Sequence, residues 1–316
     1  MSPDIEVAAL GGGHGLSATL TALRLLGAEP TAVVAMADDG GSSGRLRRDL
    51  GLPPPGDLRM ALLALADPAG AASGSEGGTA EAEVAALFGY RFDHGELAGH
   101  SLGNLVLAAL SELRGGFMEA LDTAHRLLHT RGRVLPSTLV PLRLSGQVDG
   151  QLVEGQAAIT TARGRVEQVW LDPPDAAALP EAVAAVERAD LVLLGPGSTF
   201  TSVVSTLLVP ELGAAVAAAA KDARVVYLCN LDPQSPLDET SGFPPEAHLA
   251  VLLDHCPGLR VPLVLCQRPA EEATAERETH DFAALGARVL HADLADHRIP
   301  GRHDPARLAV ALKELG

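Results

Sequence analysis

The sequence predicts an α/β protein with a three-layer, Rossmann-like, doubly wound and mostly parallel sheet, plus a small antiparallel β insertion. Three observations lead to this class. The chain opens with an apolar strand, a glycine cluster, a helical pattern and a second strand, which is the order of a βαβ unit. Short apolar runs that end in glycine or polar residues recur in the second half. Between the two halves, apolar residues alternate as in antiparallel strands.

The elements of the frame follow along the chain. The expected strands are the apolar runs 5–10, 31–37, 191–194, 225–229, 261–266 and 288–291. The expected helices run from the first glycine cluster to Leu26, from an N-cap at Asp57, over 102–113, and from Pro305 behind an N-cap at Asp304. Residues 68–80 are rich in Gly, Ala and Ser and predict a flexible loop.

The alternating segment predicts a β meander inserted around residues 138–171. Asp149-Gly150 supplies one turn signal, and Gly164 lies near a second. We expect a single domain over residues 1–316, because the doubly wound pattern resumes after the insertion.

Composition excludes several classes of protein. The 316 residues carry 40 acidic and 24 basic side chains, a formal charge of −16, and only 3% are aromatic, which argues against a nucleic-acid binder. Three cysteines are too few for a disulfide framework. The uncharged stretch 191–210 is broken by Gly-Pro-Gly, and the first residues lack a basic leader. We therefore expect a cytoplasmic protein without a membrane span.

The first glycine cluster predicts a phosphate site. Gly11-Gly12-Gly13-His14-Gly15 follows a strand and opens a helix, and from Gly13 it matches G-x-G-x-x-A. Such a loop lets the backbone approach a phosphate at a helix N-terminus. The alternative is that the glycines only make a tight turn.

A second polar loop follows the second strand. Its sequence is Asp38-Asp39-Gly40-Gly41-Ser42-Ser43. An acid at this point of a dinucleotide-binding fold holds a ribose hydroxyl, and two adjacent acids are also candidate ligands for a divalent cation such as Mg²⁺. A solvated polar turn is the alternative.

Arginines follow this loop closely in an otherwise acidic chain. We expect Arg45 and Arg59 to neutralise an anionic ligand, and Arg47 and Arg48 to lie on an exposed helix face. Asp57 precedes Arg59 by two residues and is a further candidate oxygen ligand.

A third loop repeats the strand–glycine–helix arrangement. Gly195-Pro196-Gly197-Ser198 follows the strand at 191–194, and the next strand ends at Asn230. Since these loops share the carboxyl edge of a parallel sheet, we expect them to bind parts of one ligand.

Gly99-His100-Ser101-Leu102-Gly103 matches the hydrolase elbow G-x-S-x-G, but a polar stretch precedes it where the elbow needs a buried strand. We interpret it as a loop that feeds a helix and offers His100, Ser101 and Asn104 as polar ligand contacts.

These strings, in this order, resemble the YvcK/CofD family, also described as UPF0052-type. The matching strings are the first glycine cluster, Ala37-Asp38-Asp39-Gly40-Gly41-Ser42-Ser43-Gly44-Arg45-Leu46-Arg47, Pro54-Pro55-Gly56-Asp57-Leu58-Arg59, Gly99-His100-Ser101-Leu102-Gly103-Asn104, Val134-Leu135-Pro136-Ser137, Gly195-Pro196-Gly197-Ser198 and Arg302-His303-Asp304-Pro305. Two departures are His14, where the family usually has Thr, and Met60, where it often has Asn.

The resemblance implies two functions. One branch consists of gluconeogenesis factors, regulators of cell shape and wall synthesis that bind UDP-glucose or UDP-N-acetylglucosamine, and the terminal Arg-His-Asp-Pro favours it. The resemblance implies that Arg302 contacts the nucleotide-sugar. The alternative is that Arg302 only flanks the residue that caps the last helix. The resemblance further implies a homodimer and protein partners in wall synthesis.

The other branch implies a Mg²⁺-dependent 2-phospho-L-lactate transferase of deazaflavin coenzyme synthesis. A third hypothesis, a dehydrogenase that uses NAD, rests on the first loop alone. The sequence does not decide whether the ligand is turned over or sensed.

Overall fold

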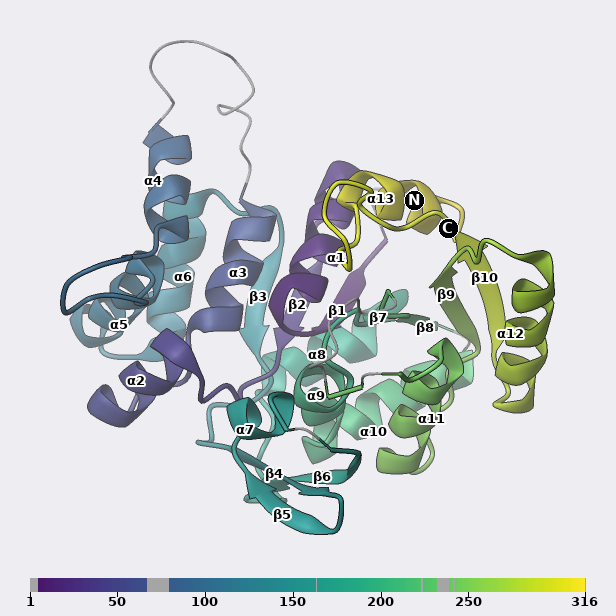
Figure 1. The fold of residues 1–316 in the computed structure, drawn as a ribbon. Coiled ribbons are helices and arrows are strands. Elements are labelled where there is room, and N and C mark those ends of the chain that lie inside the picture. The colour runs from purple at the N-terminus through teal and green to yellow at the C-terminus, as the bar shows by residue number, and fades with distance from the viewer. Residues whose placement is uncertain are drawn as a thin grey trace.

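The computed structural model describes residues 5–66, 80–162, 164–222, 224–231, 239–240 and 242–315. The α/β class is confirmed: a seven-stranded parallel sheet carries helices on both faces, and a three-stranded antiparallel sheet lies beside it (Figure 1). The loop expected at 68–80 lies, up to residue 79, outside the described residues.

The strands are β1 (Val7–Gly11), β2 (Thr31–Val34), β3 (Arg133–Pro136), β4 (Arg143–Val148), β5 (Gln151–Glu154), β6 (Val166–Asp172), β7 (Leu191–Leu194), β8 (Val225–Leu228), β9 (Leu263–Gln267) and β10 (Arg288–Ala292). The α-helices are α1 (Gly13–Leu25), α2 (Gly41–Leu50), α3 (Gly56–Leu65), α4 (Ala80–Gly89), α5 (Leu102–Arg114), α6 (Phe117–Leu128), α7 (Gln156–Thr160), α8 (Pro180–Arg188), α9 (Ser205–Leu207), α10 (Pro210–Ala219), α11 (Pro245–His255), α12 (Glu272–Ala284) and α13 (Pro305–Lys313). A π-helix, η1 (Thr199–Val204), and a 3₁₀-helix, η2 (Ala220–Asp222), complete the set.

The large sheet has the strand order β10-β9-β8-β7-β1-β2-β3. Leu10 of β1 lies opposite Val33 of β2 on one side and Leu194 of β7 on the other. From β1 the chain adds β2 on one side, and from β7 it adds β8 on the other side. Because both connections are right-handed, α1 and α10 lie on opposite faces of the large sheet (Figure 1). The order reverses between β1 and β7, where sheets of this kind bind ligands.

Most expected strands are observed because they are apolar on both sides. Every residue of β1 and of β8 is buried, as a parallel sheet covered on two faces requires. The sequence reasoning did not assign β3, which has only four residues and ends in Pro136. A proline lacks the N–H that a central strand needs, but β3 is an edge strand, where this is tolerated.

The small sheet has the order β5-β4-β6. The expected turn at Asp149-Gly150 is confirmed, with φ of 47° and 75°, as a two-residue hairpin of β4 and β5 requires. A meander would place β6 beside β5, and this part of the prediction differs from the structure. Helix α7 follows β5 and redirects the chain, so β6 pairs with β4.

One helix cap is confirmed and one is wrong. Asp304 caps α13, where its carboxylate accepts hydrogen bonds from the backbone N–H groups of Ala306 (2.8 Å) and Arg307 (3.3 Å). Asp57 is not a cap, because α3 begins one residue earlier at Gly56. The Gly56 N–H instead donates to Ser43 Oγ at 3.0 Å, so a side chain from α2 takes over this role.

In the described part of the chain, no single helix is long and apolar enough to cross a membrane. Thr199–Leu207 and Pro210–Ala219 meet the length and composition criteria only as a pair, which is bent by 86°.

Candidate functional site

A cavity of about 530 Å³ lies at the carboxyl ends of β1, β7 and β8, where the strand order reverses. Three loops and one hairpin line it. Their lining residues include Gly12, Gly13, His14 and Gly15 after β1, Pro196, Gly197 and Ser198 after β7, Asn230 and Leu231 after β8, and Asp296, Ile299, Arg302 and His303 before α13.

The first loop is held against the third. Gly13 opens α1 with a φ of +62°, which favours glycine. Gly15 faces the third loop so closely that a Cβ there would lie 2.2 Å from the Pro196 carbonyl oxygen. Thr19 of α1 donates a buried hydrogen bond to the Gly195 carbonyl at 3.2 Å. The N-terminus of α1 and the third loop therefore form one wall of the cavity.

A buried polar chain fixes the third loop from behind. The Gly197 N–H donates to Asn230 Oδ1 at 2.9 Å, so this amide is directed at a side chain rather than at a ligand phosphate. Asn230 Nδ2 donates to Thr199 Oγ1 at 3.5 Å, and Thr199 Oγ1 shares a 2.6 Å hydrogen bond with His248 Nδ1. Burial lowers the pKa of His248 to about 4, so the imidazole is neutral near pH 7.

η1 begins directly after this loop and brings Ser202 to the cavity. π-Helical turns are uncommon and often occur at functional sites. The buried carboxylate of Glu239 accepts hydrogen bonds from the backbone N–H groups of Phe200 (2.9 Å) and Thr201 (3.3 Å) at the start of η1.

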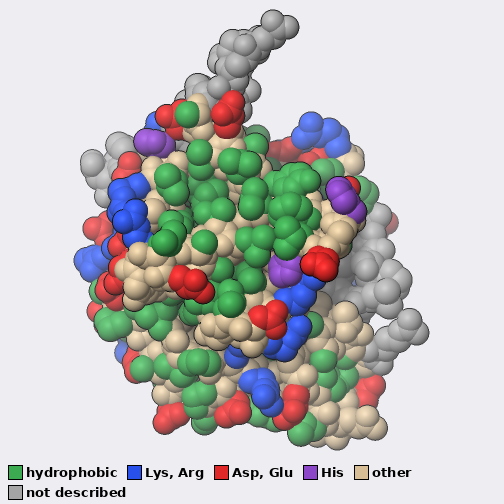
Figure 2. Space-filling model, turned by 90° about the vertical axis from the view of Figure 1, so that its left-hand side faces the viewer, with side chains coloured by type: hydrophobic (Ala, Val, Ile, Leu, Met, Phe, Trp, Pro, Cys, Tyr) green, Lys and Arg blue, Asp and Glu red, His purple; other side chains and the backbone are tan. Residues whose placement is uncertain are grey.

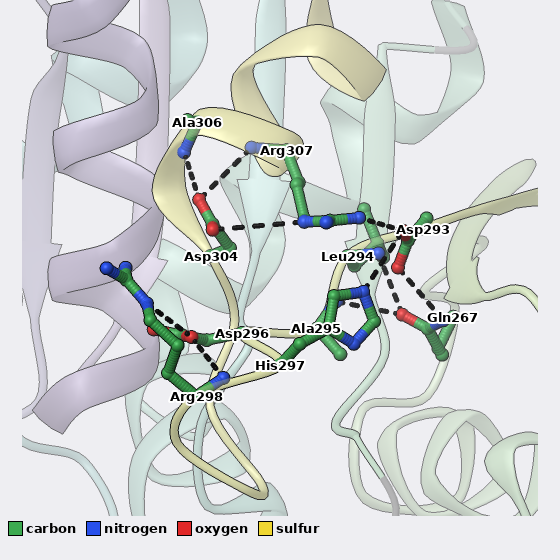
Figure 3. Close-up of polar contacts among 10 residues, drawn as sticks. All are labelled: Gln267, Asp293, Leu294, Ala295, Asp296, His297, Arg298, Asp304, Ala306 and Arg307. Atoms are coloured by element: carbon green, nitrogen blue, oxygen red, sulfur yellow. Dashed lines mark hydrogen bonds and ion pairs between the residues drawn. The ribbon is translucent and has the colours of Figure 1, made fainter.

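The hairpin that precedes α13 forms the opposite rim. An antiparallel bridge joins Ala295 to His303, and the Asp296 N–H donates to the Arg302 carbonyl at 2.7 Å. Gln267 Oε1 accepts from the backbone of Leu294 (2.7 Å) and Ala295 (2.9 Å), as Figure 3 shows.

Ion pairs and turns secure both ends of the hairpin. Arg307 pairs with Asp293 at its base (Figure 3). Asp296 Oδ1 accepts from the Arg298 N–H at 2.8 Å and closes the turn. His303 Nε2 donates to the Cys229 carbonyl at 3.1 Å, and burial lowers its pKa to about 4. His303, the residue next to Arg302, is therefore held in place by this hydrogen bond.

Arg302 and His14 face the same space. His14 has a lowered pKa, chiefly through burial and then through the positive charge of Arg302. The cavity thus combines helix N–H groups, a neutral imidazole and a guanidinium, which suits an anionic group such as a diphosphate.

The second loop lies beside this cavity and does not line it. Asp39 Oδ1 accepts from the Ala157 N–H at 2.9 Å, and Oδ2 accepts from the Gln156 N–H at 3.2 Å. Both oxygens therefore cap α7. Asp38 Oδ1 accepts from the Gly40 N–H at 3.0 Å, and burial raises the Asp38 pKa. Gly41 opens α2.

Asp38 has two acidic neighbours, Asp39 beside it in the second loop and Asp57 in α3. Burial raises the pKa of Asp57 to about 7, and the charge of Asp38 adds to this shift. A Cβ on Gly12 would lie 2.3 Å from Asp57 Oδ2, and one on Gly56 would lie 2.4 Å from Ser43 Oγ and 3.1 Å from Asp38 Oδ2. Asp57 therefore lies against the first loop at Gly12, and Ser43 and Asp38 lie against Gly56 at the start of α3.

This donor set fits a hard cation in its chemistry. Two carboxylates and a hydroxyl suit Mg²⁺, which is usually bound by one or two carboxylates and keeps several waters. No group of three or more His, Cys, Asp or Glu side chains that could hold a metal ion occurs among the described residues. Any Mg²⁺ here would depend on Asp38, Asp57 and the ligand's own phosphates.

The remaining predicted contacts form a cluster outside the cavity. Arg59 is buried, and its guanidinium donates to Asn104 Oδ1 (3.0 Å) and to the Phe88 carbonyl (3.3 Å). His100 Nδ1 shares a 3.1 Å hydrogen bond with Ser42 Oγ, which also accepts from the Ser101 N–H at 3.4 Å. The Arg45 guanidinium donates to the Ala98 carbonyl at 3.0 Å. This cluster connects α2, α3 and α5.

The structure thus brings together only part of the predicted set. Of the predicted residues, the cavity is lined by Gly12, Gly13, His14, Gly15, Gly197, Ser198, Asn230 and Arg302. Gly11 and Gly195 lie in the backbone beneath these loops. Sequence reasoning missed Ser202, Asp296 and Ile299. Nothing in the local sequence marks Asp296 or Ile299, because the fold alone places their hairpin opposite the glycine loops.

Comparisons with known proteins find similarity over nearly the whole chain. A family model described as 2-phospho-L-lactate transferase CofD matches residues 7–300. A protein of Mycobacterium tuberculosis is 46% identical over 319 residues, 97% of this chain and 89% of that protein. The gluconeogenesis factor of Bacillus subtilis is 35% identical over 325 residues, 98% of either chain. A crystal structure from Bacillus halodurans, described as a member of the UPF0052 family, matches with a TM-score of 0.84 at 35% identity and 99% coverage of both chains.

Proposed function

This chain belongs to the CofD/UPF0052 family, and on that basis we propose that it binds a nucleotide-sugar such as UDP-glucose or UDP-N-acetylglucosamine and acts as a regulator. The observation that carries the proposal is the cavity at the reversal of strand order, where glycine-rich loops lie opposite Arg302. The name of the Bacillus subtilis relative supports a regulatory role. Cell shape and wall synthesis on gluconeogenic carbon sources would be the processes affected, through proteins that sense the bound state.

In this proposal each element that lines the cavity has a part in binding the ligand. The N-terminus of α1 and Ser198 would bind the diphosphate, because helix N–H groups and a hydroxyl donate to phosphate oxygens. Arg302 would neutralise its charge from the opposite rim. Leu231 and Ile299 are among the apolar side chains of the lining and would contact the nucleoside, which agrees with a chain poor in aromatic residues.

Isothermal titration with UDP-N-acetylglucosamine tests this proposal. We expect saturable binding to the wild type and at least a tenfold weaker affinity for Arg302→Ala, because a charge-assisted contact with phosphate is lost. Arg260→Ala, an exposed arginine outside the cavity, is the matched control and should bind like the wild type. A folded wild type that releases no heat with either UDP-sugar would contradict the proposal.

The second candidate is the Mg²⁺-dependent 2-phospho-L-lactate transferase. The oxygens of Asp57 beside Gly12, and of Ser43 and Asp38 beside Gly56, favour it, together with the CofD family model. A bound Mg²⁺ would neutralise diphosphate charge as the phosphorylated group leaves. A deazaflavin acceptor assay with Mg²⁺ tests it: product that disappears in Asp57→Asn supports a transferase, and no product in the wild type argues for the regulator.

A further inference from the structure

A second cavity lies beside the C-terminal end of α2 and shares no lining residue with the first. Its volume is about 210 Å³. Three separate segments line it: Met36 after β2, Arg47 and residues 51–54 at the end of α2 and in the linker to α3, and residues 138–142 between β3 and β4. Figure 2 views the side of the molecule that carries α2 and shows Lys and Arg side chains among hydrophobic ones in its lower half.

The walls of the second cavity are apolar and largely fixed. Met36 and Leu142 are 2% and 1% exposed, so the core holds their side chains. Pro53, Pro54 and Pro141 also line the cavity, and a proline ring fixes the backbone φ at each of these positions. A ligand that enters a preformed cavity orders little of the chain, which favours binding.

Arg47 is the only charged side chain among the described residues that line the second cavity. The other polar side chain of the lining is that of Thr138, and its hydroxyl is already engaged. It donates to the Ala177 carbonyl at 2.6 Å and accepts from the Val140 N–H at 3.0 Å. The Arg47 guanidinium donates through Nη2 to the Leu142 carbonyl and retains further N–H donors. Recognition of a charged group in this cavity therefore depends on Arg47.

Arg47 lacks an ionic partner in the described part of the chain, since none of the ion pairs there includes its guanidinium. The sequence predicts that Arg47 and Arg48 share an exposed helix face, but only Arg48 is exposed and Arg47 is partly buried. Burial lowers the pKa of Arg47. The charge of Asp39 opposes this shift, but the Asp39 oxygens accept hydrogen bonds from α7 and form no ion pair with Arg47. A charge that is partly removed from water favours a counterion.

We propose that the second cavity binds a monocarboxylate with a compact apolar body of about five or six carbon atoms, whose carboxylate pairs with Arg47. An apolar cavity of about 150 Å³ is large enough to hold benzene, so about 210 Å³ leaves room for a body of that size and a carboxylate. The guanidinium presents paired N–H groups that match the two oxygens of a carboxylate. This site does not depend on which ligand the first cavity binds.

A titration followed by ligand-detected NMR tests the proposal, with benzoate as the probe. Two matched compounds separate the parts of the chemistry: benzyl alcohol lacks the charge, and acetate lacks the apolar body. We expect saturable binding of benzoate in the millimolar range or tighter, and at least tenfold weaker binding of either matched compound. No saturable binding of benzoate, or equal binding of benzyl alcohol, would overturn the proposal.

Three arginine variants locate the probe. Arg47→Gln keeps a donor for the Leu142 carbonyl but loses the charge, and we expect it to bind benzoate at least tenfold more weakly. Arg48→Gln, on the exposed face of the same helix, is the matched control and should bind like the wild type. Arg302→Ala should also bind benzoate like the wild type, since Arg302 lines the first cavity.

Melting temperatures show whether each of these variants is folded. If Arg47→Gln does not fold, the comparison of benzoate with benzyl alcohol on the wild type decides. Unchanged binding of benzoate by a folded Arg47→Gln, or a loss confined to Arg302→Ala, would overturn the proposal.

Discussion

Gly15 determines how closely the first and third loops approach. In most helices alanine is more stable than glycine by about 1 kcal/mol, so replacement should help α1. Here a Cβ would lie 2.2 Å from the Pro196 carbonyl oxygen, a contact that the backbone must move to relieve. The overlap outweighs the helical preference, because overpacking costs about 1–3 kcal/mol.

We therefore expect Gly15→Ala to lower the free energy of unfolding by about 1–2 kcal/mol and to weaken ligand binding. Urea denaturation and titration with UDP-N-acetylglucosamine measure the two effects. Gly89→Ala is the matched control, because a Cβ there meets only Leu63 Cδ1 at 3.9 Å. Equal stability of Gly15→Ala and the wild type would show that the loops can separate freely.

His248 makes the stability of the fold depend on pH. Its pKa falls from 6.5 to about 4 on folding, because burial disfavours the charged ring. Above pH 6.5 the ring is neutral in both states. As the pH falls from 6.5 to 4 the unfolded chain binds a proton that the folded chain excludes, so stability is lost on acidification.

The loss amounts to about 3 kcal/mol by pH 4, since one pKa unit corresponds to about 1.4 kcal/mol. His248→Asn keeps a polar partner for Thr199 and removes the titration. We expect the stability difference between wild type and variant to shrink as the pH falls from 7 to 4 in urea denaturation. Gln168→Asn, which replaces an exposed side chain without a titrating group, is the control that should leave the pH dependence unchanged. A constant difference across this range would contradict the assignment.

At the scale of elements, Asp39 joins the α/β frame to the β insertion. Its carboxylate caps α7, which lies 117 residues later in the chain. The sequence places Asp39 at the end of β2, where an acid of a dinucleotide-binding fold holds ribose. Only the position of the inserted segment in the fold shows that both carboxylate oxygens of Asp39 already accept hydrogen bonds from the first turn of α7.

We expect Asp39→Ala to destabilise the protein by about 0.5–2 kcal/mol, as the loss of a helix cap does, and to leave the affinity for UDP-N-acetylglucosamine within twofold. Hydrogen exchange should accelerate at the amides of Gln156 and Ala157. Asp175→Ala, an exposed acid before α8, is the control. A large loss of affinity with unchanged exchange would instead place Asp39 at the ligand.

The sequence predicts local elements better than their partners. Apolar runs and glycine loops locate β1, β7, β8 and the ends that line the cavity, because strand burial and tight turns leave strong local patterns. It does not show that β6 pairs with β4, or that Arg59 donates to Asn104 of α5. These pairings depend on how distant helices pack, and the residues themselves are ordinary polar side chains in their local context.

At the scale of the whole molecule, the cavity joins the two halves of the sheet. The first loop follows β1, the third follows β7, and the hairpin with Arg302 follows β10 at the far edge and leads into α13, which packs on α1. A ligand held by all three parts stabilises the folded chain as a unit. The stabilisation follows from mass action and needs no conformational change.

We expect UDP-N-acetylglucosamine at one hundred times its Kd to raise the free energy of unfolding by about 2.7 kcal/mol. A single cooperative shift of the whole urea transition would show that both halves respond together. Arg302→Ala at the same ligand concentration should show a shift of at most about 1.4 kcal/mol, because a tenfold higher Kd leaves the ligand at ten times its Kd, and uridine without phosphate should show a smaller shift than the nucleotide-sugar. If the urea transition is biphasic and the ligand shifts only one of its two phases, the ligand does not stabilise the two halves of the sheet as one unit.

The position of the hairpin near the end of the chain affects when, during synthesis, the cavity can form. About 290 residues separate Gly12 from Arg302, although both line one cavity. At ordinary rates of synthesis, roughly 5–20 residues per second, the two are made about 15–60 s apart. A growing chain therefore exposes its glycine loops long before the arginine arrives, and cannot capture its ligand in the proposed way. Binding would thus report that translation of the chain has passed the hairpin.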